Sequence, residues 1–428
     1  MTNPHAAIAA VFRIEFPRLV AGLARLTREV GSAEELAQDA LVVALERWPT
    51  DGVPDNPGAW LMTTAKRRAL DGVRRARIVD AKHVQIARDH DGDPRDVAGE
   101  IADALDDDVG DDLLRLVFTA CHPVLPTEAR VALTLRLVGG LATSEIARAF
   151  LVPEPTIAQR IVRAKRTLAD ARVPFEVPRA AERAERLDSV LEVIYLVFNE
   201  GHVATAGASW TRPELCDDAL RIARVLAGLA PDEPEVHGLV ALLELSASRL
   251  AARVDRDGAP VLLADQDRAR WDRVLVRRGL AALARADELV ATQGAAAGPY
   301  QLQAAIAAHH ARAATAEATE WPRIAALYAL LAQRAPSPIV ELNRAVAVAM
   351  AFGPDAGLEL VDALVADGAL AAYHLLPAVR GDLLAKLGRG DEARAEFQRA
   401  AELTRNERER DVLLARARDS AVSASRSS

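Results

Sequence analysis

The chain has 428 residues, of which 50% are hydrophobic and 4% aromatic, and its formal net charge is −8 at pH 7. This length suffices for roughly two to four domains, and a composition rich in Ala, Leu and Arg but poor in aromatic residues favours helices over sheets. The net negative charge excludes a protein that binds DNA with its whole surface, so any cations that bind DNA must be localised.

Cysteine content and hydropathy indicate the cellular environment. The two cysteines, Cys121 and Cys216, are too few for a disulfide framework or a cysteine-rich zinc site, and they fit a reducing compartment. Residues 1–16 lack the basic start and the long apolar core of a secretory signal. No uncharged apolar run approaches the ~18 residues that span a bilayer. We therefore expect a cytoplasmic protein with no membrane segment.

Residues 5–76 are predicted to form a compact helical unit with helices over 5–26, 32–47 and 57–75. Ser32 is a candidate N-cap of the second helix, and Glu35 follows three residues later, as in a capping box. The apolar face of this helix consists of Leu36, Ala40, Val43, Ala44 and Leu45. Three acids lie outside that face and can meet a basic partner helix: Glu34, Glu35 and Asp39.

The third predicted helix is basic and also carries an aromatic ring, Trp60. Its cations are Lys66, Arg67, Arg68, Arg74 and Arg75. A solvated charged helix is the ordinary interpretation of such a run. Cations for phosphates beside a flat ring for bases are also what binding of single-stranded DNA requires.

Residues 77–111 differ sharply from their surroundings. They include the run DHDGDPRDVAGEIADALDDDVGDD, which is strongly acidic and holds little core material. This composition predicts a linker, with a short helix around 97–105. The linker carries a large share of the excess negative charge, which leaves the cations concentrated on the units at either side.

Residues 112–172 are predicted to form a second helical unit that ends in a helix-turn-helix over 139–168. Its small core consists of Ile146, Ala147, Ile157 and Ile161. Thr156 can cap the second helix, and Leu151 stands where the turn often has Gly. The outward side carries Gln159, Arg160, Arg163, Lys165 and Arg166, as in a helix that reads the major groove. An ordinary helical hairpin with a solvated basic face is the alternative.

Residues 180–420 show helical patterns interrupted by Pro and Gly. The segments 338–365 and 373–403 each contain a helix, a turn with Gly and a second helix, at an offset of about 35 residues. This offset is close to the period of the tetratricopeptide repeat, and Ala at helical spacing permits the close stacking of such arrays. We therefore expect a tetratricopeptide-like domain that binds a protein or peptide partner.

Several polar residues in these helices resemble catalytic or metal-binding groups. The pairs Cys121–His122 and His309–His310 have no further ligands at metal spacing, so packing or capping roles are expected and no metal is predicted. The segment 195–202, YLVFNEGH, contains Glu200 and His202, but no nucleophile motif or phosphate loop accompanies them. We interpret it as the end of a helix, whose polar end could still serve a small molecule or a partner. No enzyme activity and no cofactor are expected.

In order and spacing, the acidic helix, the basic helix and the helix-turn-helix resemble the extracytoplasmic-function sigma factors of bacterial RNA polymerase, which belong to the sigma-70 family and are sigma-24-like. The resemblance covers residues 5–172. It implies that the polymerase β′ clamp helices are bound by Glu34, Glu35, Leu36 and Asp39. It implies recognition and opening of the −10 element by Trp60, Lys66, Arg67, Arg68, Asp71, Arg74 and Arg75. It implies that the −35 element is read by Thr156, Gln159, Arg160, Arg163, Lys165 and Arg166, with the β flap as a further partner.

Residues 111–141, residues 191–202 and the repeat region resemble the subgroup of this family that has a long C-terminal helical extension. The resemblance implies an all-α fold, with two small sigma domains followed by the repeat domain. It also implies an alternative sigma factor that the extension regulates and an acidic linker that threads through the polymerase. One alternative is a helix-turn-helix regulator that does not replace the sigma subunit. The other is a tetratricopeptide-type adaptor or enzyme with incidental N-terminal similarity.

Overall fold

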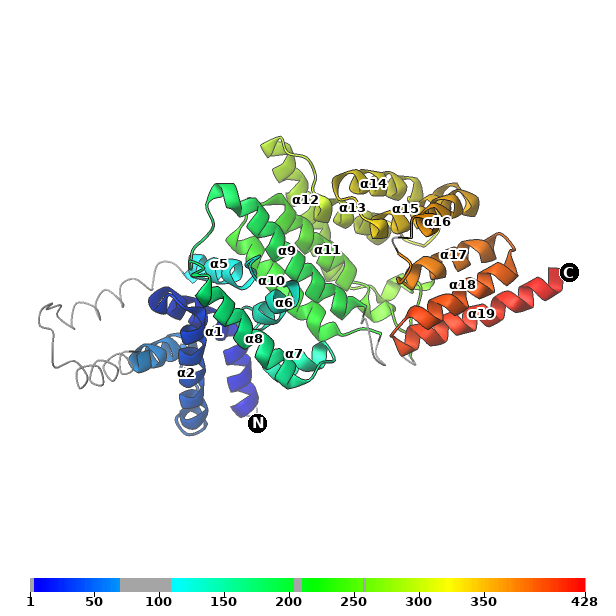
Figure 1. Cartoon of the computed structure of the whole chain (residues 1–428). Helices are drawn as coiled ribbons and strands as arrows, with labels where there is room; N and C mark the ends of the chain where they lie inside the picture. Colours follow the sequence, from blue (N-terminus) through cyan, green and yellow to red (C-terminus); the bar gives the residue numbers. More distant parts are fainter. Residues whose placement is uncertain (1–3, 70–108, 204–209, 257–258, 369, 428) are drawn as a thin grey trace, which may run out of the picture. The chain divides into compact units, whose positions relative to one another are not determined.

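The structure is a computed structural model that describes residues 4–69, 109–203, 210–256, 259–368 and 370–427 (Figure 1). Within these ranges the chain is helical and has no β-strand, and an isolated bridge joins Val254 and Pro260. The all-α prediction is confirmed. Of the predicted acidic linker, residues 77–108 and the short helix at 97–105 lie outside the described residues.

The chain forms two compact units, Met1–Ile194 and Tyr195–Ser428, called here the N-terminal and C-terminal units. The division falls inside one continuous helix, α9 (Ala180–His202). The sequence predicts a boundary between 172 and 180, marked by prolines, which is the segment directly before this helix.

The N-terminal unit begins with two helices, α1 (Pro4–Thr27) and α2 (Val30–Asp51), which pack against each other. Their connection is short because Arg28 adopts a left-handed conformation with φ 56°. The predicted capping role of Ser32 is wrong. The early turn starts α2 two residues sooner, so Glu29 occupies the N-cap position and the Ser32 hydroxyl donates a hydrogen bond to its carboxylate.

A further helix covers residues 57–69, and residues 70–75 of the predicted third helix lie outside the described residues. Trp60 on this helix packs edge-on against Trp48 of α2, with ring centroids 5.3 Å apart. Such an edge-to-face pair contributes about 0.5–1.5 kcal/mol beyond the area that it buries. Trp48 is buried and Trp60 is only partly covered, so part of the Trp60 ring remains accessible.

The rest of the N-terminal unit contains α5 (Val109–Ala120), α6 (Thr127–Leu137), α7 (Thr143–Ala149), α8 (Glu154–Asp170) and the first part of α9. Helix α5 packs on α1, while α6 and α7 pack on α8. Ile146, Ala147, Ile157 and Ile161 are all buried, so the predicted core of the helix-turn-helix is confirmed.

The first part of α9 is an integral part of this packing. Ser189 donates a hydrogen bond to the carbonyl of Cys121 at 2.7 Å, and Arg186 donates one to the carbonyl of Phe118 at 2.9 Å. Cys121 itself is buried, and burial raises the pKa of its thiol to about 11. His122 accepts a hydrogen bond from the amide of Val124 at 3.1 Å, which fits the predicted packing and capping roles of this pair.

The C-terminal unit continues as a series of helices in which chain neighbours pack against each other (Figure 1). They are α10 (Pro213–Leu229), α11 (Pro234–Ala247), α12 (Arg273–Gln293), α13 (Pro299–Arg312), α14 (Trp321–Arg334), α15 (Pro338–Phe352), α16 (Pro354–Asp367), α17 (Leu375–Lys386), α18 (Gly390–Leu403) and α19 (Glu407–Ser427). Three short 3-10 helices lie between α11 and α12: η1 (Leu250–Ala252), η2 (Leu263–Asp265) and η3 (Arg268–Arg270).

The predicted repeat corresponds to two helix pairs, α15–α16 and α17–α18. Gly357 explains how closely the first pair packs, because a Cβ there would lie 2.5 Å from the Cβ of Ala349. In the second pair, Gly381 leaves room for the ring of Phe397. Small residues at these crossings therefore let the helices stack, as the Ala-rich pattern predicts.

No helix among the described residues combines the length and the apolar character that crossing a membrane requires. The same residues contain no group of three or more His, Cys, Asp or Glu side chains that could hold a metal ion.

Candidate functional site

Helix α8 presents a basic face on the surface of the N-terminal unit. Its inward face is formed by Ile157, Ile161, Ala164 and Leu168, which are all buried. On the other side, Thr156, Gln159, Arg163 and Arg166 are exposed, while Arg160 and Lys165 are partly exposed. Thr156, Gln159, Arg160 and Arg163 also line one groove together with Leu125, Pro126, Ala129, Ala164 and Thr167. The structure thus brings these four predicted reading residues together at one surface.

The beginning of α8 differs from the prediction. Pro153 occupies the N-cap position, and the amide of Thr156 donates a hydrogen bond to the Pro153 carbonyl at 2.9 Å. Thr156 is therefore inside the first turn, so its predicted capping role is wrong. Pro153 has no amide hydrogen and a fixed φ, which makes it suitable for the entry to a helix.

Leu151 in the turn between α7 and α8 has φ 51°, the left-handed conformation for which such turns often use Gly. Its side chain is 55% exposed and contributes little packing. The left-handed conformation costs a residue other than Gly about 1–2 kcal/mol. Gly avoids this cost, but it also increases the conformational entropy of the unfolded chain, which offsets about 0.4–1 kcal/mol of the gain in stability. We expect Leu151→Gly to raise the free energy of unfolding by about 1 kcal/mol in chemical denaturation. Leu151→Ala keeps the conformational cost and is the control, so a Gly variant less stable than the Ala variant would contradict this account.

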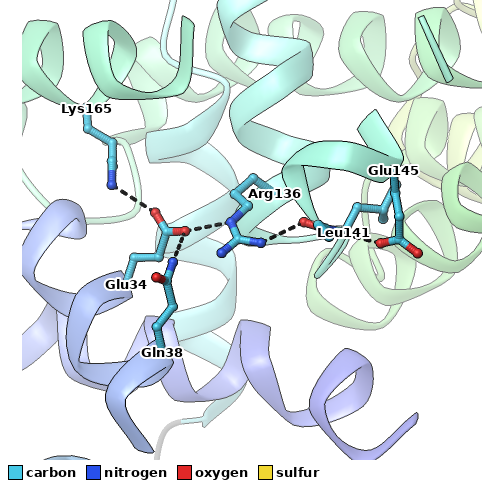
Figure 2. A network of polar contacts seen from close by, with 7 residues as sticks. Glu34, Gln38, Arg136, Leu141, Glu145 and Lys165 are labelled. Carbon is cyan, nitrogen blue, oxygen red and sulfur yellow. Dashed lines mark hydrogen bonds and ion pairs between the residues drawn. The ribbon is translucent and has the colours of Figure 1, made fainter. Parts of the chain in front are cut away.

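The acidic helix α2 does not expose all of its predicted binding residues. Glu35 and Asp39 are exposed and Leu36 is partly exposed, but Glu34 retains only 2% of its accessible surface. The Glu34 carboxylate accepts hydrogen bonds from Nε of Arg136 at 2.6 Å and from Nζ of Lys165 at 3.0 Å (Figure 2). We call Glu34, Arg136 and Lys165 the Glu34 cluster, which joins α2 to α6 and α8.

The electrostatics of the Glu34 cluster favour the ionised carboxylate. Burial by itself raises the pKa of Glu34, but the charges and hydrogen bonds of Arg136 and Lys165 outweigh it and hold the pKa below its ordinary value of 4.5. Gln38 donates a further hydrogen bond to Oε1 at 2.7 Å. Removal of one partner from a buried ion pair typically costs about 3–5 kcal/mol, because the other charge stays buried without compensation.

Arg136 is held by more than its contact with Glu34. Its Nη1 donates a hydrogen bond to the carbonyl of Leu141 at 2.9 Å, directly before α7 (Figure 2). Its guanidinium also lies over the ring of Phe16 in α1, 5.4 Å from the ring centroid. Arg136 is a site residue that was not predicted from the sequence. Its signal was a lone cation inside the apolar stretch 131–138, VALTLRLV.

The helix at residues 57–69 places part of the predicted −10 set on the surface. Arg67 and Arg68 are exposed, Trp60 and Lys66 are partly exposed, and Asp71, Arg74 and Arg75 lie outside the described residues. Arg68 forms an ion pair with Asp39 of α2 at 3.1 Å. Both side chains are exposed, and such surface pairs contribute only about 0–1 kcal/mol, so Arg68 and Asp39 can exchange partners at little cost.

Two family models describe these parts of the chain. "Sigma-70 region 2" matches residues 12–78, and "Sigma-70, region 4" matches residues 115–168. A third model, a family of unknown function (DUF6596), matches residues 186–287, which include the second part of α9 and the beginning of the C-terminal unit.

Similar proteins agree with these matches. The chain is 45% identical over 392 residues to "Uncharacterized protein R00370" of Rhizobium meliloti (strain 1021), covering 91% of this chain and 90% of that protein. It is 31% identical over 150 residues to "ECF RNA polymerase sigma factor SigK" of Mycobacterium ulcerans (strain Agy99), covering 34% and 75%. The protein of the same name from Mycobacterium tuberculosis (strain ATCC 25618 / H37Rv) is 29% identical over 170 residues, covering 39% and 86%. No solved structure matches the chain.

Proposed function

This chain belongs to the extracytoplasmic-function sigma factors of the sigma-70 family, and from that premise we propose which of its surfaces meet polymerase and promoter. It is an alternative sigma factor, which binds core RNA polymerase and directs transcription initiation. A sigma factor is a binding subunit and not a catalyst. We place it in the cytoplasm, where it would meet polymerase.

The −35 element is read by α8 in this proposal, and the exposed basic face of that helix is the observation that carries it. Thr156, Gln159 and Arg160 lie near the helix start and contact base edges. Arg163, Lys165 and Arg166 follow, and they hold phosphates, which fix the orientation of the helix on the duplex. The β flap of polymerase is the further partner of this helix-turn-helix.

The −10 element is recognised and opened by the third helix of the first sigma domain. The accessible part of the Trp60 ring offers a stacking face for an unpaired base, and Arg67 and Arg68 offer charges for the backbone. Lys66, Asp71, Arg74 and Arg75 complete the proposed set.

The β′ clamp helices are bound by α2 through Glu34, Glu35, Leu36 and Asp39. Glu35 and Asp39 are exposed, but Glu34 is occupied by the two cations of its cluster. One proposed polymerase contact and one proposed DNA contact, Lys165, therefore neutralise each other. We infer that the described arrangement is a resting state. On initiation the ion pair between Glu34 and Lys165 breaks, Glu34 binds polymerase and Lys165 binds DNA.

The C-terminal unit regulates the sigma domains in this proposal, through a partner of its helical repeats. Helix α9 supports this, because one continuous helix contributes residues to both units. Leu187, Val190 and Leu191 in its first part are buried in the N-terminal unit.

Reconstituted transcription tests the assignment. Core polymerase and this protein alone are expected to initiate at a promoter whose start site has been mapped after overexpression of the protein. Core polymerase without it is the control. Initiation only when the housekeeping sigma factor is also present would contradict the proposal, and would favour a helix-turn-helix regulator that leaves the sigma subunit in place.

A further inference from the structure

Four basic side chains of the C-terminal unit come from the end of α9, the two ends of η1 and α13. His202 is the last residue of α9, Arg249 and Arg253 flank η1, and His310 belongs to α13. We call these four residues the Arg249 cluster. Their charges act on one another, since Arg249 and Arg253 both lower the pKa of His202 and Arg249 also lowers that of His310.

Several polar atoms of the Arg249 cluster are buried without a hydrogen-bond partner. They are Nε2 of His202, Nε of Arg253 and Nδ1 of His310. Native proteins leave few such atoms unsatisfied, so each one requires an explanation. The side chains are nonetheless held in place, because the His202 ring stacks on Phe198 at 5.5 Å and the Arg253 guanidinium lies over Trp210 at 5.8 Å.

No carboxylate balances the two arginines among the residues that the structure describes. Apart from each other, the groups whose charges act on Arg249 and Arg253 are Tyr328 and Cys216. The buried acids of this unit are already paired. Glu200 pairs with Arg212, and Glu244 pairs with Arg224 at 2.8 Å and with Arg278 at 3.2 Å.

The cluster is also reachable from outside. His202, Arg249 and His310 remain partly exposed, and so does Tyr328. Burial is nevertheless the largest cause of the lowered pKa values, which are about 10 for Arg249 and about 4 for His310. The accessible parts of His202, Arg249 and His310 are where solvent and ions meet the cluster. A small anion could enter there and meet several donors at once.

We propose that the Arg249 cluster binds an oxyanion, the phosphate or carboxylate group of a small molecule, between Arg249 and Arg253. A guanidinium binds either group through two parallel hydrogen bonds. The Tyr328 hydroxyl is a further donor for the remaining oxygens. This site does not include any residue that we assign to polymerase or DNA, so its test does not depend on that assignment.

Thermal unfolding of the full-length protein tests the site, with inorganic phosphate and citrate added separately at constant ionic strength and with chloride as the reference. We expect at least one of the two anions to raise the unfolding temperature of the wild type by about 2–4 °C. Arg249→Met and Arg253→Met should lose this increase. Arg277→Met is the matched control, since Arg277 is an exposed arginine of α12, and it should keep the increase.

The same variants distinguish a ligand site from a structural role. Without added anion, Arg249→Met should unfold at or above the wild-type temperature, because it removes a desolvated charge that has no counter-ion. Arg249→Lys keeps the charge but loses the planar fork, and it should retain a smaller increase. An increase with phosphate alone identifies a phosphate site, and one with citrate alone identifies a carboxylate site. Equal increases in all variants, no increase with either anion, or a destabilised Arg249→Met protein would overturn the proposal.

Discussion

Replacement of both Arg160 and Arg163 by Ala is expected to lower transcription from a −35-dependent promoter by about 100-fold or more. Each arginine that contacts a base edge contributes about 1–3 kcal/mol of discrimination, and each phosphate contact adds affinity that depends on salt. Arg163 is exposed and Arg160 is partly exposed, and Ala favours helix, so α8 should remain folded. The measurement is reconstituted transcription with core polymerase, together with the affinity for a promoter fragment at several salt concentrations.

Two controls separate DNA reading from other effects. Arg179→Ala removes an exposed cation outside α8 and should leave transcription unchanged. Binding of the double variant to core polymerase should also be unchanged, because neither arginine is among the residues assigned to a polymerase contact. Full promoter activity in the double variant would show that α8 is not the reading helix.

The second large effect is expected for Arg136→Met, which should separate α2 from α6 and α8 and tighten binding to core polymerase by about 10–100-fold. The variant leaves the buried Glu34 with Lys165 as its remaining cation. Loss of one partner from a buried ion pair costs about 3–5 kcal/mol, and this penalises the described arrangement. An open arrangement, in which water solvates Glu34, does not carry this penalty. Arg136 is not among the proposed polymerase or DNA contacts, so the variant leaves those surfaces intact.

Arg130→Met is the matched control for this experiment. Arg130 lies on the same helix, α6, and forms hydrogen bonds with Ser189 at 2.5 Å and with Glu192 at 3.1 Å, both on α9. The Arg130→Met variant should destabilise the packing of α9 against α6 without exposing Glu34. Opening is measured as the distance between spin labels at Glu46 and Asp170, which are both exposed. An unchanged distance in Arg136→Met, or weaker polymerase binding, would refute the resting state.

If Arg136→Met fails to fold, because it also loses the contacts with Leu141 and Phe16, Lys165→Met tests the same opening from the other side of the cluster. The Lys165 side chain is partly exposed, and its Nζ donates a hydrogen bond to Glu34. The label distance should again increase. Transcription should nevertheless fall in this variant, since Lys165 is also a proposed phosphate contact.

Local patterns predicted the helices and the inward faces of this protein well. Ile146, Ala147, Ile157 and Ile161 were assigned to a core from their spacing alone, and all four are buried, because helical periodicity places residues on one face whatever lies opposite. Helix ends were less predictable. The left-handed turn at Arg28 and the entry through Pro153 each moved an N-cap by three residues, so Ser32 and Thr156 lost their predicted capping roles.

By itself, the sequence determined an all-α chain with an acidic helix α2, a basic helix predicted over 57–75 and a helix-turn-helix with an outward basic face. Only the tertiary structure decided that Glu34 is buried while its neighbour Glu35 is exposed. The reason is distance along the chain, since the partners of Glu34 are 102 and 131 residues away, at Arg136 and Lys165. Periodicity assigns an acid to a helix face, but remote cations determine whether that face meets water or a counter-charge. In this protein they turn one predicted polymerase contact and one predicted DNA contact into partners of each other.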